Sequence, residues 1–203
     1  PIIGVELNVK YNEHVFPLNF IAKSEVGYKN ISRLYSLANK HQVEYIDFKV
    51  LSLYSEDVIL LISSYDSYLT YLIENNLIFE ANEFIEDVKK VFKHRYLGIY
   101  RYKGIDEIKL NKIKEYSTQV ELLNVACQYA THLNEKDTVI LNLLDCMKKQ
   151  ISANKEFLND SSIVSMYLKS KEQLNVFYDK DELNNLETLI NLVNLKISKV
   201  DFS

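Results

Sequence analysis

The stretch PIIGVELNVKYNEHVFPLNFIAK (residues 1–23) decides how the chain begins to fold. It holds two short runs of β-branched and aromatic residues, PIIGVELNV (1–9) and FPLNFIAK (16–23), each bounded by polar residues. Runs of this length and composition are typical of strands. A helical pattern follows over 24–40, with Ser24 as a suitable N-cap and one apolar stripe. The stripe consists of Ile31, Leu34, Tyr35 and Ala38. The sequence therefore predicts two strands that lead into a helix.

The rest of the chain alternates short apolar runs with amphipathic segments. VILLI (58–62) is apolar throughout, as expected of a strand buried on both faces of a parallel sheet. Further strands are predicted at 96–100 and 122–126. Helices are predicted at 47–51 with Asp47 as the cap, 67–75, 79–93, 108–116, 136–150 and 183–200. This alternation predicts an α/β domain with a mostly parallel sheet, although the pattern alone does not distinguish an open sheet from a barrel.

The last two helices carry apolar residues at helical spacing, which we expect to face the core. In 136–150 these are Val139, Ile140, Leu143, Leu144 and Met147, and in 183–200 they are Leu186, Leu189, Ile190, Val193 and Ile197. A turn is expected at 103–104 and a polar loop at 152–162. No internal repeat or low-complexity linker divides the chain, so we predict one domain over 1–203.

The composition restricts the class of function. The chain has 28 acidic and 24 basic residues and a net charge of −4, whereas a surface devoted to duplex DNA needs clustered Lys and Arg. No apolar run is long enough to cross a bilayer and no secretory signal pattern is present, so we expect a cytoplasmic protein with no membrane partner. Cys127 and Cys146 are too few for a disulfide framework and lie in no metal-binding CxxC.

Two further patterns have plain structural interpretations. The basic run KKVFKHR (89–95) is expected to be a solvated helix end rather than a surface for DNA or an acidic partner. Tyr65, Tyr68 and Tyr71 are expected to pack rather than to stack on bases, because no basic groove accompanies them. The sequence contains no Gly-rich phosphate loop, Ser/His/Asp set or HExxH motif.

Six segments in collinear order resemble those of a known family. They are PIIGVELNV (1–9), FIAKSEVGYKNISRLYSLA (20–38), YSEDVILLISS (54–64), RYLGIYRYKG (95–104), NVACQYATHLNEKD (124–137) and YLKSKEQL (167–174). Together they resemble the PHP (polymerase and histidinol phosphatase) domain of bacterial DNA polymerase III alpha subunits of the DnaE type. The resemblance implies a distorted (β/α)7 barrel with mostly parallel strands.

Two features of the chain add expectations to this resemblance. The chain has no initiator Met and lacks the histidine-rich opening of the family, so we expect an N-terminally truncated, incomplete barrel without its first strand–helix units. Asn, Lys, Ile and Tyr are favoured, which suggests a lineage with a genome poor in G and C.

Active members of the family resemble metal-dependent phosphoesterases, with His, Asp, Glu and Cys ligands at the C-terminal ends of the barrel strands. Bound metal ions in such sites hold phosphate oxygens and lower the pKa of a bridging water. Glu6 matches the metal-binding glutamate of the family. Other ligand positions hold different residues: Pro17 for a histidine, Ser64 for a cysteine, and Tyr129 and Thr131 for an aspartate and a histidine. His132 lies one residue from the last position, and such a shift turns a strand side chain to the opposite face, although a slipped alignment would restore it.

We therefore predict no catalytic residue, no cofactor-binding residue and no metal site, with Glu6 as the only matching ligand position and His132 as a weak candidate. The resemblance implies a scaffolding role in a replicative polymerase. Its main partners would be the polymerase domains of the same polypeptide. The proofreading exonuclease subunit and other replisome subunits would be further partners. DNA would be contacted through the parent protein. Mg²⁺ would be bound only in the polymerase domain of that parent, a nucleotidyltransferase.

Two alternatives stay open. One is a metal-dependent phosphoesterase or 3′–5′ proofreading exonuclease, in which Glu6 and His132 join ligands from upstream residues. The other is an interaction module unrelated to replication.

Overall fold

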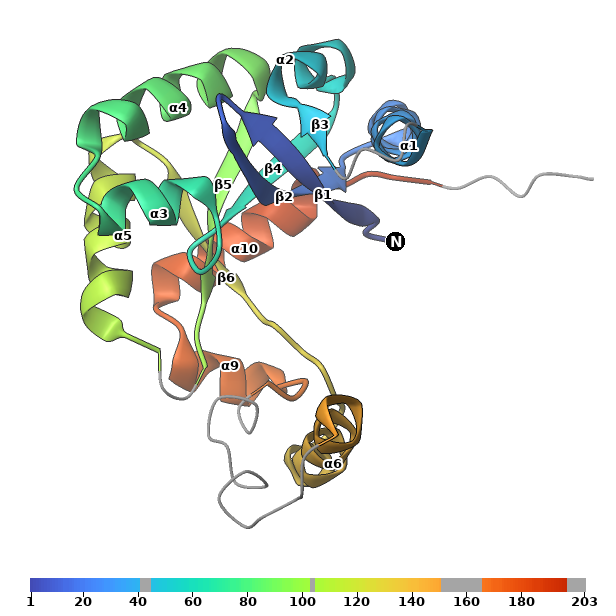
Figure 1. Cartoon of the computed structure of the whole chain (residues 1–203), viewed down its shortest axis with the longest axis vertical. Helices are drawn as coiled ribbons and strands as arrows, with labels where there is room; N and C mark the ends of the chain where they lie inside the picture. The colour runs from blue at the N-terminus through green and yellow to red at the C-terminus, as the bar shows by residue number, and fades with distance from the viewer. Residues whose placement is uncertain (41–44, 103–104, 151–165, 197–203) are drawn as a thin grey trace, which may run out of the picture.

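Six strands form one sheet in the part of the chain that the computed structural model describes, residues 1–40, 45–102, 105–150 and 166–196 (Figure 1). The strand order is β3-β1-β2-β4-β5-β6. Their bounds are Gly4–Tyr11 (β1), His14–Ala22 (β2), Ile46–Asp47 (β3), Val58–Ser63 (β4), His94–Tyr100 (β5) and Leu123–Cys127 (β6). β2 pairs antiparallel with β1 and β4, whereas the other three pairs are parallel. All strands except β2 therefore run in one direction, with β3 and β6 at the edges, which confirms the predicted α/β fold and is consistent with an incomplete barrel.

The opening strands form a hairpin that leads into a helix, as predicted. Asn12 and Glu13 make the turn, and Asn12 has a left-handed φ of 52°, a conformation that asparagine tolerates. The hairpin continues into α1 (Glu25–Lys40). The Ser24 hydroxyl accepts a hydrogen bond from the Val26 amide at 3.2 Å, so it caps the helix as expected.

The remaining helices alternate with the strands. They are α2 (Phe48–Leu51), α3 (Tyr68–Glu74), α4 (Ile78–Val91), α5 (Glu107–Gln119), α6 (Thr138–Lys149), α9 (Lys171–Phe177) and α10 (Lys180–Leu192), with short 3₁₀ turns at Ser52–Tyr54 and Glu135–Asp137. The Asp47 carboxylate accepts from the Lys49 amide, which confirms the predicted cap of α2. The last helix, predicted over 183–200, is shorter at its end: α10 begins at Lys180 and stops at Leu192, because Val193 takes an extended conformation. The predicted turn at 103–104, the predicted loop at 152–162 and residues 197–200 lie outside the described residues.

Helices α1 to α5 cover one face of the sheet with a large apolar core. All six residues of β4 are buried, as predicted for a strand covered on both faces. The largest side chains of this core are completely enclosed, among them Phe20, Leu34, Leu60, Phe84 and Phe92. Burial of this much apolar surface is the main stabilising contribution to the fold.

Helix α10 covers the other face, where it crosses the middle of the sheet in Figure 1. Leu189 packs there in a second apolar core with Ile59 and Leu61 of β4, Tyr96 of β5 and Val125 of β6. Just beyond the helix, the Asn194 amide donates to the Lys23 carbonyl at 2.8 Å. The residues just after α10 are thereby joined to the segment that links β2 to α1.

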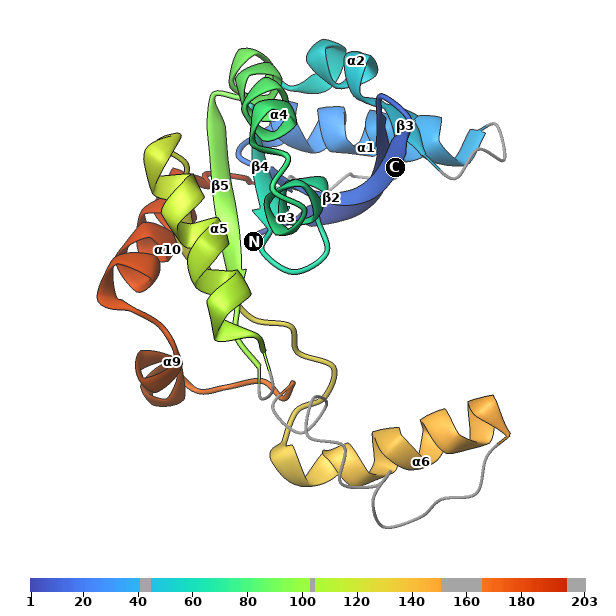
Figure 2. The same cartoon turned by 60° about the vertical axis from the view of Figure 1, so that its left-hand side comes forward.

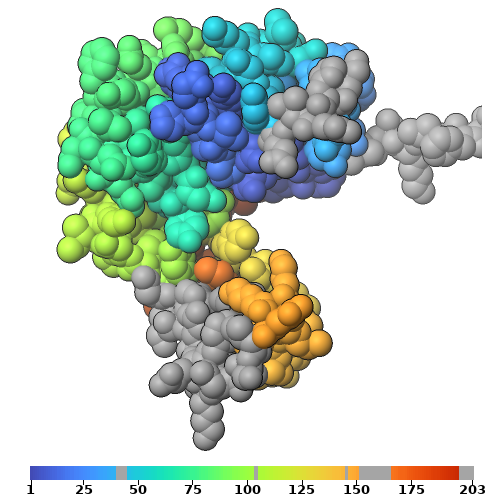
Figure 3. All heavy atoms as spheres, in the orientation of Figure 1, coloured from blue at the N-terminus to red at the C-terminus, as the bar shows by residue number. Residues whose placement is uncertain are grey.

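Helix α6 differs from its prediction, because its apolar stripe does not face the core. Figure 2 shows α6 standing away from the sheet, and Figure 3 shows its residues (orange) as a protrusion below the blue, cyan and green part of the surface. The five residues predicted to be inside are 41–73% exposed: Val139, Ile140, Leu143, Leu144 and Met147. The buried residues of the helix are instead Thr138, Asn142 and Cys146. Helical spacing identifies residues that share a face, but it does not determine which face meets the rest of the molecule.

Smaller corrections concern single side chains. Tyr35 and Ile190, both predicted to face the core, are 55% and 43% exposed. Of the three tyrosines expected to pack, only Tyr68 is buried, where it stacks on Phe16 at a ring distance of 5.0 Å. Tyr65 is 59% exposed.

The basic run at 89–95 is only partly a solvated helix end. Lys89 and Lys90 are paired with acidic residues one turn earlier in α4, at 2.8 Å from Glu86 and from Asp87, respectively. His94 begins β5 and is half-buried.

Candidate functional site

A cleft of about 350 Å³ lies beside the C-terminal ends of β4, β5 and β6. Ligands of α/β proteins commonly bind at this end of a sheet, because loops from several parallel strands converge there. The cleft is lined by Glu6, Asn19, Ser63, Tyr65, Asp66, Tyr100, Tyr102, Gln128, Tyr129 and Met166.

Glu6 and Asn19 reach the cleft from the hairpin, where they are register partners on β1 and β2. Side chains alternate between the two faces of a strand. Leu7 and Val9 point into the first core and are buried, so Glu6 lies on the other face and is exposed.

The turn after β4 supplies a second carboxylate and an aromatic wall. The Ser63 hydroxyl accepts from the amides of Tyr65 at 3.1 Å and Asp66 at 3.4 Å, which fixes the direction of this turn. The Tyr65 ring meets the Tyr102 ring, which follows β5, edge to face at a centroid distance of 5.5 Å. Such T-shaped pairs are a favourable aromatic arrangement.

Tyr100 indicates the electrostatic character of the cleft. Burial raises the pKa of its phenol, and Cys127 and the negative charges of Asp66 and Glu6 raise this pKa further. Both carboxylates therefore act on the same hydroxyl. None of the described lining residues carries a positive charge.

The positions aligned with family ligands are distributed around this cleft rather than gathered in it. Pro17 is half-buried in β2 opposite Asn8. Ser64 is buried, and its hydroxyl accepts from the Tyr100 amide at 3.1 Å. Tyr129 lies in the cleft wall, whereas the exposed Thr131 donates to the Met166 carbonyl at 3.2 Å.

His132 does not line the cleft with Glu6. Its Nδ1 atom lies 2.9 Å from the Thr131 hydroxyl, and its Nε2 atom lies 3.0 Å from the Thr138 hydroxyl. Both ring nitrogens are thus engaged by threonines, one of which, Thr138, is the first residue of α6. Within the described residues, no three His, Cys, Asp or Glu side chains gather closely enough to hold a metal ion.

Comparison with protein families identifies this fold. Residues 1–101 match the model of the PHP domain. The chain belongs to the PHP domain family. This finding confirms the resemblance noted in the sequence.

Three curated relatives of this PHP chain are named DNA polymerase III subunit alpha. The protein from Aquifex aeolicus (strain VF5) is 30% identical over 151 residues, which is 70% of this chain and 13% of that protein. The protein from Borreliella burgdorferi is 27% identical over 190 residues, or 86% of this chain and 17% of that protein. The protein from Rickettsia felis is 42% identical over 66 residues, or 30% of this chain and 6% of that protein. The PHP chain therefore spans less than a fifth of the length of each of these relatives. No helix among its described residues has the length and apolar character needed to cross a bilayer.

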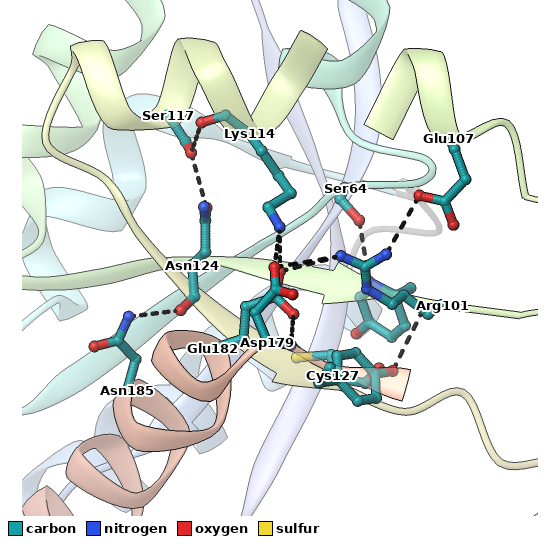
Figure 4. A network of polar contacts seen from close by, with 12 residues as sticks. Ser64, Arg101, Glu107, Lys114, Ser117, Asn124, Cys127, Asp179, Glu182 and Asn185 are labelled. Carbon is teal, nitrogen blue, oxygen red and sulfur yellow. Dashed lines mark hydrogen bonds and ion pairs between the residues drawn. The ribbon is translucent and has the colours of Figure 1, made fainter. Parts of the chain in front are cut away.

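A polar network joins the matched part of the PHP chain to the segment that follows it (Figure 4). Arg101, the last matched residue, lies 3.4 Å from Glu182 and 3.3 Å from Glu107. Lys114 of α5 lies 2.7 Å from both Asp179 and Glu182. No local sequence pattern predicts this network, because its members lie up to 81 residues apart in the chain.

The same region contains hydrogen bonds to backbone groups of the sheet. The Tyr178 hydroxyl donates to the Cys127 carbonyl, and the Asn185 amide group donates to the Asn124 carbonyl at 2.8 Å. Burial raises the pKa of Tyr178 to about 12 and that of the Cys127 thiol to about 12, so both stay neutral at physiological pH. These contacts fix α10 on β6 beside the cleft.

Proposed function

We propose that this chain is a non-catalytic PHP domain with a structural role in a replicative DNA polymerase III alpha subunit. The three relatives named DNA polymerase III subunit alpha support the assignment to this kind of polypeptide. DNA synthesis would take place in other domains of the same polypeptide, which would bind both the DNA and the Mg²⁺ needed for nucleotidyl transfer. Those domains would be the main partners of this one, with a proofreading exonuclease subunit as a further partner, in the cytoplasm.

The observation that carries the proposal concerns the side chains at and beside the family's metal-ligand positions. Ser64 and His132, which have atoms that could bind a metal, already form hydrogen bonds within the protein. The Ser64 hydroxyl accepts from a backbone amide, and both nitrogens of His132 are hydrogen-bonded outside the cleft. Pro17 has no donor group at all. A catalytic metal cluster needs several ligands that converge on the same ions, whereas Glu6 alone keeps the family's ligand type.

A structural role also fits the way in which α10 is attached. The ion pairs of Lys114 and Arg101 with Glu182 and Asp179, together with the Leu189 contacts, hold α10 firmly against β4, β5 and β6. A domain stabilised in this way presents a fixed surface to neighbouring domains. Interfaces between rigid bodies require less loss of conformational entropy than interfaces with mobile segments.

Metal analysis of the purified chain tests the proposal. The chain is dialysed against excess MnCl₂ or ZnCl₂ and then against metal-free buffer, and bound metal is measured by mass spectrometry. We expect far less than one ion per chain, and the same low value for Glu6→Gln. One or more ions per chain in the wild type, reduced in Glu6→Gln, would contradict the non-catalytic assignment.

Activity assays separate this proposal from the phosphoesterase alternative. Hydrolysis of bis-p-nitrophenyl phosphate and removal of a 3′-terminal nucleotide from a labelled primer are measured with Mn²⁺ present. We expect rates equal to the buffer blank for both the wild type and Glu6→Gln. A rate that falls in Glu6→Gln, with Glu115→Gln as an exposed acidic control, would favour an enzyme.

A further inference from the structure

A second hollow adjoins the cleft beside Glu6 at the Tyr65–Tyr102 pair. Tyr65, Asp66 and Tyr102 line both spaces, so the two tyrosines form a shared wall. The second hollow measures about 470 Å³. Its other lining residues are Ser64, Glu74, Ile105, Asp106, Lys109 and Leu110. We call these two adjoining hollows together the tyrosine groove.

The described part of the tyrosine groove has an excess of negative charge. Glu6 and Asp66 line the first hollow without any positive charge from a described residue. In the second hollow, Lys109 is paired with Glu74 at 3.2 Å, and the Asp106 carboxylate accepts from two amides at the start of α5. A phosphate group would meet repulsion in such a place, whereas a cation would be attracted.

The aromatic rings narrow the class of cation. Tyr65 and Tyr102 meet edge to face at 5.5 Å, and Tyr65 keeps 59% of its surface exposed, so a ring face is open to a ligand. Cations are attracted to the faces of aromatic rings, and a planar guanidinium also stacks on them. A guanidinium can in addition donate two parallel hydrogen bonds to a carboxylate. A volume of about 350 Å³ in the first hollow is far larger than a bare metal ion needs and suits a whole side chain.

We propose that the tyrosine groove binds an arginine-containing segment of a partner polypeptide, with the guanidinium between the Glu6 and Asp66 carboxylates and against the Tyr65 ring. The second hollow, on the other side of the tyrosine wall, accommodates the residues that flank this arginine. The inference goes beyond a structural role in a polymerase, because it names the chemistry of the contact and does not depend on which protein supplies it. It also does not require any metal ion.

Fluorescence anisotropy with a labelled peptide tests the proposal. The probe is fluorescein-Gly-Ser-Arg-Gly-Arg-Gly-Ser-amide, titrated with the full chain in buffer that contains EDTA. A matched peptide with citrulline in place of arginine keeps the shape and removes the charge. We expect the citrulline peptide to bind about ten-fold more weakly or worse, because it loses the charge-assisted hydrogen bonds. Equal binding of the two peptides would overturn the proposal.

Variants locate the binding on the chain. Glu6→Gln/Asp66→Asn should weaken arginine-peptide binding about three- to ten-fold, because carboxylate pairing to the guanidinium is lost. Tyr65→Ala should weaken it about two- to five-fold, the size of one exposed cation–π contact. Tyr35→Ala and Glu115→Gln remove an exposed tyrosine and an exposed acid on other parts of the surface, and they should leave the affinity unchanged. Circular dichroism checks that each variant is folded.

Two further outcomes would contradict the proposal, one on the kind of ligand and one on the place of binding. If arginine amide alone competes as strongly as the unlabelled peptide, the groove is a small-molecule site and the polypeptide proposal is wrong. If the groove variants bind like the wild type, the peptide binds elsewhere and the proposal is also wrong. Because EDTA is present, neither result depends on the metal content that tests the proposed function.

Discussion

The ammonium nitrogen of Lys114 on α5 lies 2.7 Å from a carboxylate oxygen of Glu182 on α10. The Glu182 side chain is only 3% exposed, and its other cation is Arg101 at 3.4 Å. Burial lowers the pKa of Lys114, but its hydrogen bonds to Asp179 and Glu182 outweigh this effect and raise the pKa overall. Lys114 therefore stays charged, and it compensates a carboxylate that has left water.

Replacing Lys114 by Met should destabilise the domain considerably. The change leaves the buried Glu182 carboxylate with Arg101 as its only cation in the described network. Removing one partner of a buried pair costs about 3–5 kcal/mol, and the remaining arginine should reduce this to about 2 kcal/mol. Urea denaturation followed by circular dichroism measures the free energy of unfolding.

Two comparisons make this measurement specific. Lys29 and Glu25 form an exposed pair at 2.8 Å on α1, so Lys29→Met should change the stability by less than about 0.5 kcal/mol. Lys114→Met/Glu182→Leu should recover part of the loss, because no unpaired charge remains buried. If Lys114→Met and Lys29→Met have equal effects, the buried pair does not contribute as described.

Gly27→Ala should also be destabilising, although alanine favours helices. A β-carbon at Gly27 in α1 would lie 2.0 Å from the Asp57 carbonyl oxygen, which belongs to the backbone and cannot rotate away. The gain in helix propensity is at most about 1 kcal/mol, whereas overpacking costs about 1–3 kcal/mol or more. We expect a net loss of about 2 kcal/mol and a melting temperature about 4–8 °C lower. Lys29→Ala in the same helix is the control. If Gly27→Ala melts at the same temperature as the wild type, the close approach of Gly27 to the Asp57 carbonyl is contradicted.

His94 should make the stability depend on pH. Burial and the nearby charges of Lys23 and Lys93 lower the pKa of its imidazole below the usual 6.5. The unfolded chain therefore takes up a proton at a higher pH than the folded chain does, so acidification through 6.5 favours unfolding. We expect the wild type to lose stability between about pH 7.5 and pH 5.5, and His94→Gln to lose less over this range. His14→Gln, at an exposed position, is the control, and parallel pH profiles for the wild type and His94→Gln would refute the assignment.

Glu6→Gln should leave the melting temperature within about 1 °C of the wild type, since Glu6 is exposed and surface substitutions usually change stability by under about 0.5 kcal/mol. Adding MnCl₂ or ZnCl₂ should raise the melting temperature of neither protein, because only a ligand that binds the folded state stabilises it. Thermal unfolding monitored by circular dichroism measures both effects. A metal-dependent rise in the wild type that is absent in Glu6→Gln would indicate a metal site around Glu6.

The predicted elements that the structure confirms are those with strong local signals. The continuous apolar run at 58–62 became the buried strand β4, and Asp47 and Ser24 cap helices as expected. Helix α6 shows what local sequence patterns do not predict, namely which side of a helix is buried. Its stripe has helical spacing, but the buried residues of the helix are Thr138, Asn142 and Cys146, and the spacing of apolar residues does not determine which side is covered.

The candidate site was predictable only through the resemblance, which pointed to Glu6. The other groove residues, Asp66, Tyr65 and Tyr102, were missed as site residues. They directly follow β4 and β5, and residues just after parallel strands share one end of a sheet, so their positions carried a usable signal. The pairing of Lys114 with Glu182 carried no such signal, because it depends on how α10 lies across the sheet.

The packing of α10 has a consequence for how the protein is made. Leu189 covers strands formed by residues 58–127, and the Asn194 amide bonds to Lys23, so the two faces of the sheet are completed at different times during synthesis. A ribosome translating this chain releases the six described strands and helices α1 to α5 before α10 emerges. Until then Ile59, Leu61 and Val125 have no cover from α10, and the nascent chain passes through a stage with a bare apolar patch that a chaperone can recognise.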